Sequence, residues 1–123
     1  MPQNFIAIGS GLALVGILAR SLSSHALLAL LESNGKLDNF NLAADYLLLH
    51  GLALIAVAIL CRLFPDAGYH RAGWAFLAGS VLFQGSVLVK SFVSIHPFGF
   101  ITPIGGLLLM VGWLVLLIAA LRA

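Results

Sequence analysis

The sequence predicts an all-α integral membrane protein, an antiparallel bundle of four transmembrane helices, on the strength of two observations. First, 62% of the 123 residues are hydrophobic and 8% are charged, whereas a soluble domain carries about a quarter charged residues. Second, four apolar runs each have roughly the 20 residues that a helix needs to cross a bilayer. They cover about residues 5–25, 42–63, 72–93 and 100–121. The chain is therefore expected to be one transmembrane domain.

Each run is expected to be helical because hydrocarbon offers backbone N–H and C=O groups no water to bind. None of the runs alternates apolar and polar residues, as a strand of a membrane barrel does. The first run has no Lys or Arg ahead of its apolar core. It therefore differs from a cleaved signal peptide and is expected to remain in the protein.

Three short connections are expected to join the helices. The first, "ESNGKLDNFN" (32–41), contains the turn signal Asn34-Gly35 and offers Asn39 or Asn41 as a helix cap. The others, "FPDAGYHRAG" and "SIHPFGF", contain prolines that interrupt a helix. Short connections favour antiparallel neighbours, and therefore an up-down-up-down bundle.

The distribution of basic residues predicts the orientation in the membrane. The side that holds both termini carries Arg62, Arg71 and Arg122, and the opposite connection carries Lys36. The other two cations lie inside apolar runs and are expected to reach toward headgroups, so they are not counted. Three basic residues against one place both termini in the cytoplasm by the positive-inside rule.

Polar residues gather in the half of the predicted bundle away from the termini. We expect them to form one cluster that either binds a ligand or stabilises the structure. Its members are Arg20, Ser24, His25, Asp45, Tyr46, His50, Ser86, Lys90 and Thr102.

Three expectations concern contacts within this cluster. Asp45, the one carboxylate within a run, is expected to pair with Arg20 or Lys90, because an unpaired charge in a bilayer is costly. His50 is expected to point inward and to hydrogen-bond to the first or third helix. Ser21, Ser24 and His25 are expected to contact "ITPIGG" and so to clasp the first helix to the fourth. The alternative makes His25 a ligand for a cofactor or an ion.

Small residues are expected to let the helices approach closely, as they do in many membrane proteins. The candidates are Gly9, Gly16, Gly79, Gly85, Gly105, Gly106 and Gly112.

No motif in the sequence indicates catalysis. A zinc site needs several converging ligands, and His25, His50 and Asp45 are the only candidates. The lone Cys61 excludes a cysteine-based zinc cluster. We find no Ser/His/Asp order, Gly-rich phosphate loop or basic nucleic-acid patch. We therefore expect no catalytic residue, no metal, no cofactor and no nucleic-acid partner.

Four segments carry a resemblance to a known family: "SSHALL", "DYLLLHGLALI", "AGWAFLAGSVLFQGS" and "ITPIGGLLLMVGWLVL". Over residues 9–121 they resemble the YgdD, or transmembrane protein 256, family of small four-helix membrane proteins, a domain-of-unknown-function family. His25, Tyr46 and His50 match its pattern, whereas Leu47 stands where a glutamine is usual. The resemblance implies four helices and a bacterial inner-membrane or mitochondrial location, and it supplies no established reaction.

Two classes of function remain open from the sequence. In the first, the protein is an accessory or assembly subunit that packs in the lipid bilayer against other membrane subunits or as a homo-oligomer. In the second, His25, Asp45, His50 and Lys90 bind a quinone headgroup, a lipid headgroup or an ion. The small size of the chain favours the first, and the ionisable groups at depth favour the second.

Overall fold

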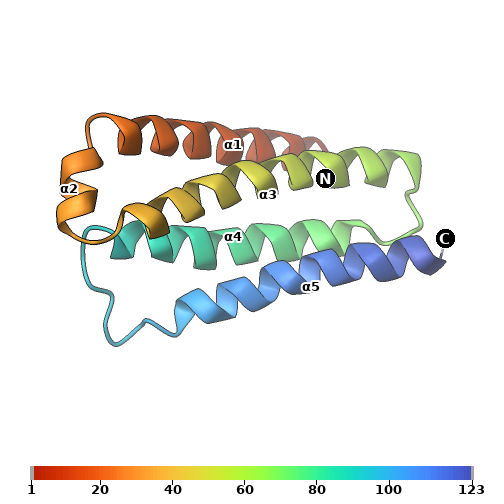
Figure 1. Cartoon of the computed structure of the whole chain (residues 1–123). Helices are drawn as coiled ribbons and strands as arrows, with labels where there is room; N and C mark the ends of the chain where they lie inside the picture. The colour runs from red at the N-terminus through yellow and green to blue at the C-terminus, as the bar shows by residue number, and fades with distance from the viewer. Residues whose placement is uncertain (1, 123) are drawn as a thin grey trace.

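The computed structural model describes residues 2–122, in which helix is the only regular secondary structure (Figure 1). Within these residues four helices are long and apolar enough to cross a membrane, which confirms the predicted all-helical class with four candidate spans. The long helices are α1 (Pro2–Ser24), α3 (Leu37–Leu63), α4 (His70–Lys90) and α5 (Ile101–Arg122), and a short helix, α2 (Leu28–Ser33), follows α1.

The first connection is shorter than the sequence indicated. α3 begins at Leu37, so Asn39 and Asn41 lie inside the helix and the prediction that one of them caps it is wrong. The turn before α3 uses Gly35, whose φ of 67° is left-handed and suits glycine. With 27 residues, α3 is about 40 Å long. It exceeds the roughly 30 Å of hydrocarbon, so it is long enough to span that layer with its polar first turns outside it.

The short helix α2 was not expected, because its sequence "LALLES" continues the apolar composition of the first run. It turns across the end of the α1–α3 pair (Figure 1). Leu31 of α2 is fully buried and belongs to a small apolar cluster with Ala19, Phe40 and Ala44. This packing closes one end of the space between α1 and α3.

α1 and α3 touch through small residues. A Cβ added at Gly9 would lie 2.5 Å from the carbonyl oxygen of Gly51, and one at Gly16 would lie 2.6 Å from that of Ala44. Such distances leave no room for a side chain, so the two backbones are in contact. The two contacts come in reverse order along the two helices, which therefore run in opposite directions.

α4 and α5 pack in the same manner. Gly105 lies directly against the backbone of Phe83, so a Cβ there would overlap the neighbouring helix. Gly112 lies beneath the ring of Phe76, where a Cβ would come within 2.5 Å of a ring carbon. These contacts also come in reverse order along the two helices.

The remaining candidate glycines differ in how closely they approach another helix. A Cβ at Gly79 would meet the Leu109 side chain at 2.8 Å, and one at Gly106 would make ordinary contact with the Phe83 ring at 3.5 Å. Around Gly85 no atom lies within 4 Å of an added Cβ. Among the described residues, Gly85 therefore makes no close contact with another helix.

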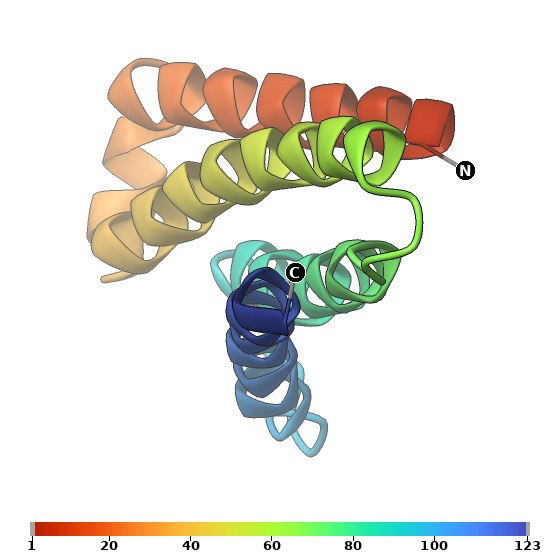
Figure 2. The ribbon, with the colours of Figure 1, turned by 90° about the vertical axis from the view of Figure 1, so that its right-hand side faces the viewer.

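The four long helices form two pairs that are joined through α3 and α4 (Figure 2). The main apolar core lies at this junction and includes Phe5, Leu54, Val57, Ala72 and Phe76. α1 packs chiefly on α3 and α5 on α4, so α1 and α5 form the two outer helices. In both views the beginning of α5 and the connection before it lie furthest from the α1–α3 layer.

Candidate functional site

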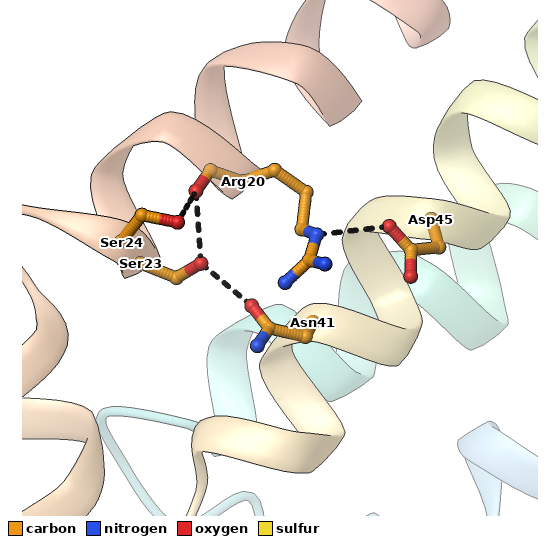
Figure 3. A network of polar contacts seen from close by, with 5 residues as sticks. All are labelled: Arg20, Ser23, Ser24, Asn41 and Asp45. Atoms are coloured by element: carbon orange, nitrogen blue, oxygen red, sulfur yellow. Dashed lines mark hydrogen bonds and ion pairs between the residues drawn. The ribbon is translucent and has the colours of Figure 1, made fainter.

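An ion pair joins α1 to α3 near one end of the molecule (Figure 3). Arg20 Nε lies 3.1 Å from Asp45 Oδ1, which is one of the two pairings that the sequence predicted for Asp45. The two side chains are 48% and 57% exposed, so the pair lies on the outside of the bundle. An ion pair exposed to water contributes only about 0–1 kcal/mol, and this pair also neutralises two charges that would otherwise be unpaired.

Next to this ion pair, a buried serine provides a second polar contact between the same helices. Ser23 Oγ lies 2.6 Å from Asn41 Oδ1 and 3.0 Å from the carbonyl oxygen of Arg20. Ser24 donates to that same carbonyl at 3.0 Å and so stays on its own helix. We call Arg20, Ser23, Ser24, Asn41 and Asp45 the outer network (Figure 3). Sequence reasoning missed Ser23 and Asn41 as contact residues.

The expectation that "SSHA" at the end of α1 contacts "ITPIGG" at the start of α5 is wrong for the described residues 2–122. His25 is exposed in the turn after α1. Thr102 of α5 instead shares a 2.6 Å hydrogen bond with Ser86 of α4, because α5 packs on α4 and not on α1. Pro103 lies in the first turn of α5, where backbone N–H groups have no partner within the helix, so it removes no helical hydrogen bond.

His50 is buried in the middle of α3 and both of its ring nitrogens have partners. The residue is 2% exposed. Its Nδ1 lies 2.9 Å from the carbonyl oxygen of Tyr46, and its Nε2 lies 3.2 Å from Trp113 Nε1 of α5. The prediction that His50 points inward and is hydrogen-bonded is confirmed. The predicted partner is wrong, because the residue across the interface belongs to the fourth span.

These two contacts fix the tautomer of His50. A carbonyl oxygen can only accept a hydrogen bond and an indole N–H can only donate one. Nδ1 must therefore carry the proton and Nε2 must carry the free lone pair, which makes the ring neutral. The imidazole thus links α3 to α5 through its hydrogen bond with Trp113.

Aromatic side chains surround His50. The Phe76 ring lies 5.5 Å from the imidazole and 4.8 Å from the Trp113 ring, and Tyr46 stacks at a tilt on Phe83 at 5.6 Å. We call Tyr46, His50, Phe76, Phe83 and Trp113 the aromatic cluster. It includes residues of α3, α4 and α5 and fills the space where these three helices meet.

One buried amide was not among the candidates. Gln84 is fully buried and its Nε2 donates to Ser80 Oγ, one turn earlier in α4, at 3.1 Å. Its Oε1 accepts no hydrogen bond from the described residues. The i, i+4 spacing of Ser80 and Gln84 was the available signal for this pair.

Lys90 does not join Asp45. It lies at the end of α4 and lines an open cavity with Lys36 from the turn before α3. The expected single cluster is thus divided among the outer network, the aromatic cluster, the Ser86–Thr102 bond and the Lys90 cavity, while His25 stands apart. Within residues 2–122 no three His, Cys, Asp or Glu side chains gather as they would around a metal ion. Chemically, most of these groups tie one helix to another.

Comparison with known families identifies one that matches this chain. The profile of a family described as "Protein of unknown function (DUF423)" matches residues 10–106. This range runs from the middle of α1 into α5 and includes "SSHALL", "AGWAFLAGSVLFQGS" and "ITPIGG". No curated protein and no solved structure matches the chain significantly. Because the match covers most of the sequence, the chain belongs to the DUF423 family of proteins of unknown function.

Proposed function

We propose that this protein is a non-catalytic accessory or assembly subunit that packs against a larger complex in a bacterial inner membrane. The observation that carries the proposal is the exposed apolar surface of the two outer helices. In the most apolar stretches of α1 and α5 only 22% of residues are buried, against 39% in α3 and 50% in α4. Lipid or partner helices must cover the remaining surface.

The exposed face of α5 is continuous. Leu107, Met110, Leu114, Leu117 and Leu121 follow one another at helical spacing and are between 52% and 77% exposed. This spacing gives one straight apolar ridge, which is the surface that a neighbouring transmembrane helix packs against. α1 offers a second such face around Leu14 and Leu18.

The state of the interior polar groups supports a non-catalytic role. His50, the deepest ionisable residue among the candidates, has both ring nitrogens engaged by Tyr46 and Trp113. Ser86 and Thr102 bond to each other. Groups that are occupied in this way stabilise the bundle and are not free to act as a base or a nucleophile.

Site-specific photo-crosslinking in native membranes tests the proposal. A photoreactive residue at Leu107 or Leu14 should capture a different membrane protein, while one at Leu31, which is fully buried in the bundle, should not. Crosslinks to lipid alone from both outer faces would reject the accessory-subunit role. Crosslinks only to a second copy would replace the larger complex by a homo-oligomer.

We also propose that both termini lie in the cytoplasm, for which the excess of Arg62, Arg71 and Arg122 over Lys36 is the support. Cysteine labelling tests it: in a Cys61-free background, a cysteine at Asp66 should react only after the membrane is permeabilised, and one at Lys36 in intact cells. The reverse pattern would invert the orientation. Labelling of both from one side would contradict the four-span topology.

A further inference from the structure

The end of the bundle that holds Lys36 and Lys90 contains an open cavity of about 450 Å³. Its wall is built by the turn before α3, the last residue of α4 and the connection that leads to α5. Asn34 donates an amide hydrogen bond to the carbonyl oxygen of Ser91 at 3.3 Å, which ties these two connections together. The volume falls in the range of about 300–1,000 Å³ that is typical of small-molecule sites.

The charge of the cavity wall is one-sided. Lys36 and Lys90 both belong to it, and no Asp or Glu of the described residues does. Within residues 2–122 neither ammonium group has a carboxylate at ion-pair distance, and the one ion pair of these residues joins Asp45 to Arg20. Both lysines are half-buried and line the same cavity, whose wall contains no Asp or Glu of the described residues.

The rest of the wall combines apolar side chains with polar ones, which suits an amphipathic ligand. Phe92 and Ile95 belong to the wall together with His96. Phe92 is 44% exposed and its neighbour Val93 is 59% exposed, although both follow the end of a transmembrane helix. Lysine ammonium groups at a membrane surface attract anionic lipids, and the adjacent Phe92 and Ile95 provide apolar surface that acyl chains could contact.

The opposite end of the bundle provides an internal comparison. A second cavity of about 370 Å³ there is lined by Arg71 and Arg122, but its wall also contains Asp66. A carboxylate in the wall lowers the attraction for an anion. The cavity with Lys36 and Lys90 is therefore the better anion site of the two.

We propose that this cavity binds a phosphate group, carried by an anionic phospholipid whose headgroup lies between Lys36 and Lys90. The site is independent of the accessory-subunit role, because the lysines lie at the end of the bundle and not on the exposed faces of α1 and α5.

The test uses the full chain purified in neutral detergent and probed by native mass spectrometry with phosphatidylglycerol, phosphatidylcholine or inorganic phosphate. Wild-type protein should retain one phosphatidylglycerol in preference to phosphatidylcholine. Replacing each lysine by glutamine should weaken this binding roughly fivefold, the contribution of one basic residue at an anionic membrane surface, and Lys36→Gln/Lys90→Gln should weaken it by roughly 30-fold. Lys36→Arg/Lys90→Arg, which keeps both charges, should retain binding.

The matched control is Arg62→Gln/Arg122→Gln, which removes the same net charge from the other end of the bundle and should leave phosphatidylglycerol binding unchanged. If inorganic phosphate binds in a lysine-dependent way and phosphatidylglycerol does not, the phosphate site stands and its source is the free anion. The proposal would be overturned if the double lysine variant and the double arginine variant lost phosphatidylglycerol binding equally. Equal binding of phosphatidylglycerol and phosphatidylcholine by the wild-type protein would also overturn it. If the lysine pair fails to fold, Lys36→Gln alone decides, because Lys36 lies in a turn outside the helices.

Discussion

Trp113 in α5 donates its indole N–H to Nε2 of His50 in α3, across 63 residues of sequence and 3.2 Å of space. The backbones of these two helices are not packed closely against each other. The direct contact between α3 and α5 therefore runs through these two long side chains, with the Phe76 ring of α4 packed beside both. The bond provides the last partner for a buried imidazole and anchors the outer helix α5 to the centre of the bundle.

Trp113→Phe should lower the free energy of unfolding by about 0.5–2 kcal/mol, the range of hydrogen bonds between membrane helices. Phenylalanine keeps much of the ring contact with Phe76 and removes only the donor. The free energy of unfolding is measured in mixed micelles for three proteins: Trp113→Phe, His50→Leu and the double variant. If the two single effects simply add, the hydrogen bond contributes nothing and the cluster is held by packing alone.

Gly105→Ala should lower the free energy of unfolding by about 1–3 kcal/mol, because the added methyl group would overlap the backbone of Phe83 and force α4 and α5 apart. Gly85→Ala is the matched control. Its methyl group meets open space, and alanine favours a helix over glycine by up to about 1 kcal/mol. Thermal unfolding of both variants in detergent checks the difference. Equal destabilisation would show that α4 and α5 are not in backbone contact at Gly105.

Asp45→Asn should lower stability by no more than about 1 kcal/mol, because its ion pair with Arg20 is half exposed. The effect should shrink further at high salt, which screens exposed charges. Unfolding at two salt concentrations measures it, with Asp66→Asn in the exposed α3–α4 turn as the comparison. A loss of several kcal/mol that salt does not alter would mean that the pair is buried against lipid or a partner.

Gln84→Met should leave stability unchanged or raise it. The amide oxygen of Gln84 is fully buried without a hydrogen-bond donor among the described residues, and an unsatisfied polar group costs about 1–3 kcal/mol. Methionine has a similar shape and removes that cost, which offsets the loss of the hydrogen bond from Gln84 Nε2 to Ser80 Oγ. Thermal unfolding compared with Ser80→Ala checks this. Marked destabilisation by Gln84→Met would show that the oxygen has a partner, such as a buried water, that stabilises the fold.

The number and approximate extent of the spans could be predicted because length and hydropathy depend only on local sequence. The expectation that Asp45 pairs with Arg20 or Lys90 followed from the cost of an isolated charge in lipid, and the structure selects Arg20. α2 could not be predicted, because "LALLES" has the composition of a continuing span. Its separation from α1 depends on the packing of Leu31 against Phe40, which only the fold creates.

The partners of the polar side chains were harder to predict because they depend on the rotation of each helix about its axis. His50 was correctly expected inside, yet hydropathy gave no sign that Trp113 would reach it. The "ITPIGG" segment was expected to contact the first helix, whereas its Thr102 bonds to Ser86 of α4. When every face of a helix is apolar, the sequence pattern does not mark which face meets which neighbour.

The pairing of the helices has a consequence for the order of synthesis. The contacts of Gly9 with Gly51 and of Gly16 with Ala44 need no residue beyond the end of α3, so the backbones of α1 and α3 can come together before α4 and α5 have been made. His50 is different, because its Nε2 lacks its native partner until Trp113 has been made. The last helix to be made, α5, therefore supplies the hydrogen-bond donor that His50 in the centre of α3 needs to complete its native contacts.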